Sequence, residues 1–116
     1  GEDEEGKIDM IFLYAKYCCY QGKYELAKQY MDQLNINNCS NQKEKYYMLK
    51  AFYAEKIGDK QDVKENIEAL LDLDVTYLNM GIVRSIMEES NVAINSSYQE
   101  CLENEKEESY KIVLGE

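Results

Sequence analysis

The chain has 116 residues, of which 45% are hydrophobic, and it contains no proline and no histidine. This composition excludes a wholly disordered chain, and the lack of proline argues against a linker or a loop-rich fold. A formal net charge of −10 opposes nonspecific binding to nucleic acid, because the phosphates would be repelled. No apolar run approaches the roughly 18 to 20 residues that a membrane helix needs, so membrane insertion is not expected.

The first predicted elements follow an acidic stretch, GEDEEG, which we expect to form a flexible tail over residues 1–6. From residue 8 onwards, apolar residues recur at helical spacing and predict a helix that Gly22 ends, since glycine accepts positive φ. A second helix is predicted over residues 24–34, where the spacing resumes. The apolar stripes of the two helices comprise Ile8, Ile11, Phe12, Ala15, Cys18, Tyr24, Ala27, Met31 and Leu34.

A second pair of helices is predicted over residues 41–73. Asn41 and Glu44 have the spacing of a capping box, which marks the start of a helix. Gly58 is expected to end this helix, and Asp59 to cap the next one. The loop between the two pairs, NINNCSNQ, is polar and rich in asparagine, which is typical of a turn between structural units.

The third unit, residues 75–110, is predicted to be atypical. A fifth helix is expected from Val75 to Ser90, and the pattern that begins at Ser96 indicates a sixth. Terminal units of helical arrays tend to be atypical because one face meets water, so this unit is expected to be a solvated cap. The alternative is the cut end of a longer array. Residues 111–116 are expected to form a C-terminal tail.

An internal repeat relates the first two pairs. Residues 10–35 align with residues 46–71 at a constant offset, which matches Ala15 with Ala51 and Gly22 with Gly58. A small residue in the first helix and a glycine at the turn resemble the tetratricopeptide repeat (TPR) family over residues 8–73, although the closing proline of that family is absent. The resemblance implies an all-α fold with antiparallel helical hairpins stacked as a short right-handed solenoid of about six helices. The repeat domain would span residues 7–110, with units 8–36, 41–73 and 75–110.

The resemblance also implies a non-catalytic protein- or peptide-binding scaffold, because the first helices of successive TPR units line a concave groove. A clamp for a terminal carboxylate is not expected, since Phe12 and Leu49 stand where that clamp has a lysine and an asparagine. Lysines outnumber carboxylates in the groove, so a ligand with apolar anchors and a negative flank is expected. The groove positions carried over are Phe12, Lys16, Cys19, Tyr20, Lys45, Met48, Phe52, Glu55, Lys56 and Arg84.

The four cysteines, Cys18, Cys19, Cys39 and Cys101, are expected to be free thiols rather than disulfides or a zinc site. Neighbouring Cys18 and Cys19 are too close to pair with each other, and neither histidine nor C-x-x-C spacing is available for zinc. Cys18 is predicted to fill the core, and Cys19 to face the groove one residue further along the helix. Free thiols favour a cytoplasmic compartment, with an exported protein whose signal sequence has been removed as the alternative.

Catalysis is not predicted, because histidine is absent and no activated cysteine is indicated. No cofactor or metal is expected. The expected partner is a protein or peptide, without nucleic acid or membrane, and self-association through the terminal repeats is a further expectation. Two alternatives to the scaffold stay open. One is a helical sensor or regulatory segment of a larger protein, such as a peptide-responsive regulator, and the other is a small acidic immunity-type inhibitor of a basic target.

Overall fold

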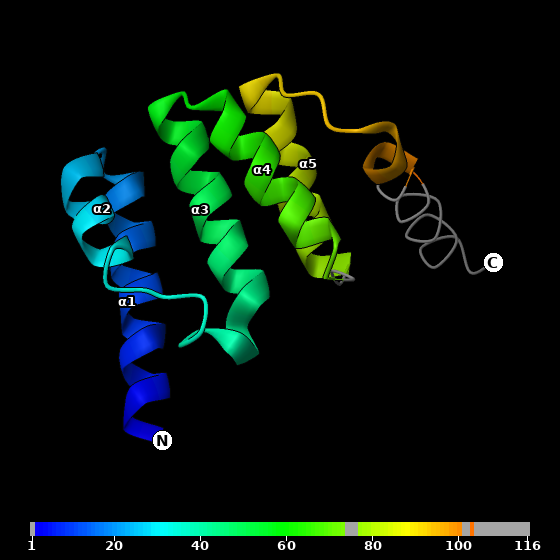
Figure 1. Ribbon diagram of the computed structural model, residues 1–116. Helices are drawn as coiled ribbons and strands as arrows, with labels where there is room; N and C mark the ends of the chain where they lie inside the picture. Colours follow the sequence, from blue (N-terminus) through cyan, green and yellow to red (C-terminus); the bar gives the residue numbers. More distant parts are fainter. Residues whose placement is uncertain (1, 74–76, 101–102, 104–116) are drawn as a thin grey trace, which may run out of the picture.

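The computed structural model describes residues 2–73, 77–100 and 103, and the regular structure in these residues is helical, without strands. The predicted all-α fold class is thereby confirmed. Residues 96–100 are also helical. The helices lie side by side in a compact arrangement (Figure 1). Their bounds are α1 (Glu2–Tyr20), α2 (Tyr24–Met31), the 3₁₀ helix η1 (Ser40–Gln42), α3 (Lys43–Ile57), α4 (Lys60–Leu71) and α5 (Tyr77–Ser90).

Glycine ends both α1 and α3, as predicted, and the two turns share one backbone motif. Gly22 has φ +75° and Gly58 has φ +80°, in the left-handed region that glycine adopts without steric cost. In each turn the N–H of the glycine and that of the next residue donate back to the helix, which satisfies its last carbonyls. The donor–acceptor pairs are Gly22 to Cys19 (3.1 Å), Lys23 to Cys18 (2.8 Å), Gly58 to Glu55 (3.2 Å) and Asp59 to Ala54 (2.9 Å).

Several helix boundaries differ from the prediction. Helix α1 begins at Glu2, so the expected tail is helical from that residue onwards. The capping box expected at Asn41 is not formed, because residues 40–42 make a 3₁₀ turn and α3 starts without a side-chain cap. Asp59 does cap α4, accepting a hydrogen bond from the Asp62 backbone at 3.2 Å. The first two residues of the predicted fifth helix, the later part of the sixth and the tail 111–116 lie outside the described residues.

The core is built where small side chains let helices approach closely. Ala51 and Ala54 on α3 have no exposed surface, and they pack in one cluster with Val63 and Ile67 of α4. A second cluster joins α1 to α2 through Cys18, Cys19 and Ala27. Because alanine occupies the contact positions, the helices of each hairpin can approach each other closely.

The two hairpins and α5 contact one another through the first helix of each pair. Helix α1 packs against α3, and α3 packs against α5, while α2 and α4 each pack against the first helix of their own hairpin. Smaller contacts join α2 to α3 and α4 to α5. Helices α1, α3 and α5 therefore lie next to one another in series.

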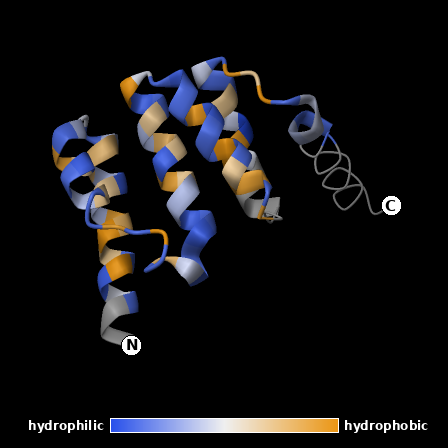
Figure 2. Cartoon of the chain, in the orientation of Figure 1, coloured by the Kyte–Doolittle hydropathy of each residue, from blue (hydrophilic) through white to orange (hydrophobic). Residues whose placement is uncertain are grey.

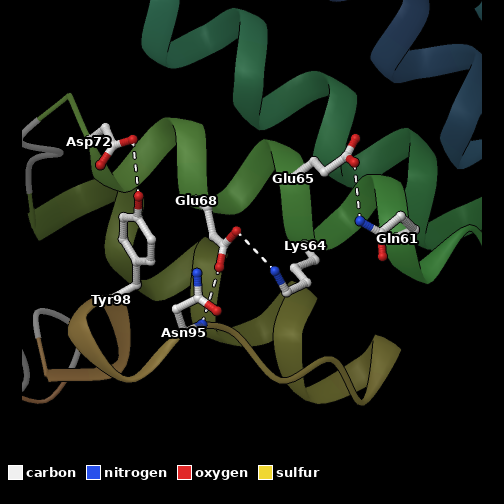
Figure 3. Close-up of polar contacts among 7 residues, drawn as sticks. All are labelled: Gln61, Lys64, Glu65, Glu68, Asp72, Asn95 and Tyr98. Carbon is white, nitrogen blue, oxygen red and sulfur yellow. Dashed lines mark hydrogen bonds and ion pairs between the residues drawn. The ribbon is translucent and has the colours of Figure 1, made fainter.

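The segment after α5 is fastened to α4 (Figure 3). The Tyr98 hydroxyl donates to the Asp72 carboxylate at 3.1 Å, and the Asn95 backbone N–H donates to Glu68 at 3.1 Å. Lys64 pairs with the same Glu68 carboxylate at 3.1 Å. These contacts hold residues 95–98 against the outer side of α4, which leaves the surface shared by α1, α3 and α5 open.

Candidate functional site

A pocket of about 770 Å³ lies between α1, α3 and α5, and we refer to it as the groove. Its volume falls within the range of roughly 300 to 1,000 Å³ typical of ligand sites. One part of the lining is apolar and the other is charged or small. The apolar residues are Phe12, Leu13, Tyr20, Met48, Leu49, Phe52, Ile82 and Ile86, and the others are Asp9, Lys16, Glu44, Lys45, Lys56, Gly81, Ser85 and Glu89.

Most residues predicted for the groove lie in this lining. They come from successive turns of α1 and α3, where positions three or four residues apart share one helical face. The resemblance-based positions on α1 and α3 are therefore brought together in space. Those that line the groove are Phe12, Lys16, Tyr20, Lys45, Met48, Phe52 and Lys56.

Cys19 does not line the groove, and its predicted position there is wrong. Only 2% of the residue is exposed, and it packs in the core cluster with Cys18 and Ala27. Burial is the main cause that raises the pKa of its thiol from 9.0 to about 11, followed by the neighbouring Cys18, while the Lys56 charge acts in the opposite direction. Cys19 is therefore a core residue, protonated at neutral pH.

Glu55 and Arg84, the two other exceptions, also lie outside the lining. The Glu55 side chain is only 12% exposed and its carboxylate lies 3.5 Å from the Lys56 ammonium, so it supports a groove residue instead of facing the ligand space. Arg84 is half-buried on α5. Its neighbours Ile82 and Ser85 do line the groove, but a rotation of about 100° per residue carries Arg84 off that face.

The contribution of α5 is the part that sequence reasoning missed. Five lining residues of this helix have the spacing i, i+1, i+4, i+5 and i+8, which defines a single helical face. That periodicity is visible in the sequence. The rotation of α5 relative to α3 is not, because it depends on packing between residues far apart in the chain. The five residues are Gly81, Ile82, Ser85, Ile86 and Glu89.

One end of the groove is held by a polar contact between α1 and α3. The Lys45 ammonium lies 3.6 Å from the Asp9 carboxylate, and the Gln42 side-chain amide donates to the same carboxylate. Both ion-pair partners are more than half exposed, so the pair contributes little to stability. Its effect on the groove is to neutralise Lys45 locally.

The other end of the groove combines aromatic rings with lysines. The ring centroids of Tyr20 and Phe52 are 5.2 Å apart, and the Lys56 ammonium lies 5.1 Å from the Phe52 centroid, within cation–π range. Lys16 precedes Tyr20 by one helical turn and lines the same pocket. This end, which we call the aromatic–lysine cluster, consists of Lys16, Tyr20, Phe52 and Lys56.

The expected excess of positive charge is not found across the groove as a whole. Three lysines and three carboxylates line it, because Glu44 and Glu89 contribute and Arg84 does not. The charges are instead separated in space. Lys16 and Lys56 stand on α1 and α3 around the aromatic rings, whereas Glu89 stands on α5. A ligand therefore meets positive charge at the aromatic–lysine cluster, while Asp9 and Glu44 place carboxylates elsewhere on α1 and α3.

Three other features of the described residues bear on function: metal sites, cysteine thiols and membrane-spanning helices. No group of three or more cysteine, aspartate or glutamate side chains there is placed to hold a metal ion. Cys18, Cys19 and Cys39 are free thiols and buried, and Cys101 lies outside the described residues. Among the described helices, none is long and apolar enough to cross a membrane.

Comparisons with protein-family models, with curated proteins and with solved structures return no match for this chain. The geometry and chemistry of the groove are therefore the basis for assigning a function.

Proposed function

We propose that the chain is a non-catalytic, TPR-like binding module whose groove holds a protein segment with apolar side chains and an acidic flank. The observation that carries this proposal is the groove itself, in which three helices contribute eight apolar side chains around a space of about 770 Å³. An apolar concavity edged by a few polar groups is the usual form of a binding site.

We propose that the hairpins form a repeat arrangement of the TPR type, stacked as a right-handed solenoid, and two features support the repeat. The turns at Gly22 and Gly58 share one hydrogen-bonding pattern, so the two hairpins are built alike. The first helices α1, α3 and α5 contact one another in series, which is how a stacked array would form a continuous inner surface.

The distribution of charge favours an acidic flank on the ligand. Lys45 is paired with Asp9 and Lys56 with Glu55, and both Lys16 and Lys56 border the aromatic rings of Tyr20 and Phe52. Apolar ligand side chains would pack on the rings, and a neighbouring Asp or Glu would reach the lysines. The flank would lie beside Lys16 and Lys56, at the aromatic–lysine cluster.

A binding role also agrees with the state of the nearest cysteine. Cys19 is buried behind the groove, and its raised pKa disfavours the thiolate that nucleophilic chemistry would need. We therefore assign no catalytic step to the groove.

Selection from a displayed library of random peptides against the immobilised protein tests the proposal. We expect enriched peptides to combine aromatic or aliphatic residues with Asp or Glu, and their binding to be lost in Ile82→Arg. The matched control is Ile57→Arg: both isoleucines are 45% exposed, but Ile82 lines the groove and Ile57 does not.

Failure to enrich any peptide, or equal loss of binding in both variants, would contradict a peptide-binding groove. Enrichment of Lys- and Arg-rich peptides that still bind Ile82→Arg would favour the alternative of an acidic inhibitor acting through its outer carboxylates.

A further inference from the structure

Helix α1 carries a row of large apolar side chains that remain largely exposed in the fold. Met10, Leu13, Tyr14 and Tyr17 are exposed to 51%, 65%, 43% and 59%, and we call these four residues the outer stripe. Their spacing, i, i+3, i+4 and i+7, places them on one face of the helix. The central turns of α1 are hydrophobic (Figure 2), whereas the exposed Leu26, Ile57 and Ile82 stand singly on other helices.

The opposite side of α1 is apolar as well. Ala15, Cys18 and Cys19 are buried there in contact with the rest of the fold. Between residues 10 and 20 the only charged residue is Lys16. A helix that is hydrophobic all round is typical of a helix buried all round, and a monomer covers only one side of α1.

We infer that the outer stripe is a homodimer interface, in which α1 packs antiparallel against α1 of a second copy. The stripe is symmetric about the point midway between Leu13 and Tyr14. An antiparallel pairing centred there sets Met10 opposite Tyr17 of the second copy, and Leu13 opposite Tyr14. The same four residues of each copy then form both sides of the interface, as two-fold symmetry requires.

The charge beside the stripe favours the antiparallel orientation. Lys7 is exposed and lies two helical turns before Tyr14, on the same side of α1. Parallel packing would set the two Lys7 ammonium groups side by side, whereas antiparallel packing separates them. Antiparallel helix dipoles add to this preference.

The exposed area suits a dimer of modest affinity. The four side chains present on the order of 400 Å² per copy, if a side chain of this size presents about 200 Å² when fully exposed. A standard interface buries about 800 Å² per partner, so residues around the stripe must supply the rest. With −10 on each copy, long-range repulsion opposes association, and added salt should therefore tighten the dimer.

Sedimentation velocity of the purified chain, from low micromolar to submillimolar concentration, tests this inference. We expect a concentration-dependent dimer that tightens as sodium chloride is raised. The double variant Met10→Lys/Tyr17→Lys, at two stripe positions outside the groove lining, should be monomeric over the whole range, and Ile57→Lys, which changes an isolated exposed isoleucine, should dimerise like the wild type. A wild type that stays monomeric, or a dimer that survives the double variant, would overturn the inference.

Disulfide trapping distinguishes the orientation of the helices. In a Cys101→Ser background, Leu13→Cys should form a disulfide-linked dimer, because the two introduced thiols lie near the two-fold axis. Met10→Cys should not, since antiparallel pairing separates the two copies of that position by about 10 Å along the helix. Equal cross-linking of both variants would contradict the antiparallel arrangement.

The proposed dimer interface and the proposed peptide groove can be tested independently of each other. Loss of dimerisation in the stripe variant with peptide binding retained would support the interface and leave the proposed function unaffected. The groove variant Ile82→Arg should in turn leave the dimer intact, because α5 takes no part in the stripe. Loss of the dimer in Ile82→Arg would place the interface in the groove and overturn the assignment to α1.

Discussion

The ring of Tyr20 lies 5.2 Å from the ring of Phe52, centroid to centroid, and this contact joins the last turn of α1 to α3. The two rings differ in exposure, since Phe52 is half-buried and Tyr20 is 67% exposed. A free monomer therefore keeps a large aromatic surface in water beside Lys16 and Lys56. Exposed aromatic surface next to positive charge is a favourable place for a ligand anchor.

We predict that Tyr20→Ala weakens binding of a selected peptide by about 1 to 3 kcal/mol, as an aromatic anchor at an interface does. Its effect on the free energy of unfolding should be small, because the side chain is largely exposed. Tyr17→Ala, nearly one turn earlier and outside the groove lining, is the control for loss of an exposed tyrosine. Isothermal titration and chemical denaturation give the two quantities, and equal binding by both variants would remove Tyr20 from the site.

Substitution by alanine should have opposite effects on the free energy of unfolding at Gly58 and at Gly6. Gly58→Ala should destabilise the fold by about 1 kcal/mol, because φ is +80° there and a Cβ disfavours that conformation. Gly6→Ala should stabilise it by up to about 1 kcal/mol, since Gly6 is inside α1 and an added Cβ meets no atom within 4 Å. Urea denaturation of both variants tests this contrast, which a shared direction of change would contradict.

Overpacking between helices should be costly at the fully buried alanines. Ala15→Leu and Ala51→Leu are each expected to lower the free energy of unfolding by about 1 to 3 kcal/mol, because neither residue has exposed surface. Ala69→Leu, at a half-buried position on α4, is the control and should cost less. A neutral effect of either buried substitution would show that the helices do not approach closely at that position.

Stability should fall at alkaline pH, partly through Cys19. The pKa of this thiol is raised from 9.0 to about 11 in the fold, mainly by burial. Below pH 9 both the folded and the unfolded chain keep the proton, so the contribution of Cys19 to stability is complete there. Between pH 9 and 11 the unfolded chain ionises first, and the free energy of unfolding should decrease.

The variant Cys19→Ala isolates this contribution. The pKa of Tyr53 is also raised by burial and by Glu25, so part of the alkaline destabilisation should persist without the thiol. Denaturant unfolding across the same pH range should give a shallower decrease for Cys19→Ala than for the wild type. Identical slopes for the two proteins would mean that the thiol is not buried in the folded state.

Local features of the fold could be predicted from the sequence, and long-range packing could not. Gly22 and Gly58 identify both turns because positive φ is a property of single residues. Cys19 was assigned to the groove because one step of helical rotation decides between groove and core, and the rotation of α1 depends on α2 and α3. The position of Glu89 in the groove likewise depends on how α5 is rotated against α3, which the sequence does not reveal. Phe12, Met48 and Phe52 could be predicted because the same helical face recurs in the two hairpins.

The start of α3 is another feature that the local sequence does not predict. Asn41 and Glu44 have the spacing of a capping box, but the chain makes a 3₁₀ turn there, and Gln42 instead donates to Asp9 on α1. A contact with another helix therefore accompanies a start to α3 that differs from the local capping pattern. Sequence spacing alone does not reveal such a contact.

The most direct test of the proposed function is a comparison of two charge-reversed variants in binding a selected acidic-flanked peptide, measured by fluorescence anisotropy. Lys16→Glu/Lys56→Glu reverses both lysines of the aromatic–lysine cluster. Lys28→Glu/Lys60→Glu makes the same change in net charge on α2 and α4, outside the groove lining. We predict that the first variant weakens binding by about 1 to 3 kcal/mol while remaining folded, and that the second binds nearly as the wild type does. Equal affinities of the two variants for the peptide would contradict the assignment of the groove as the binding site.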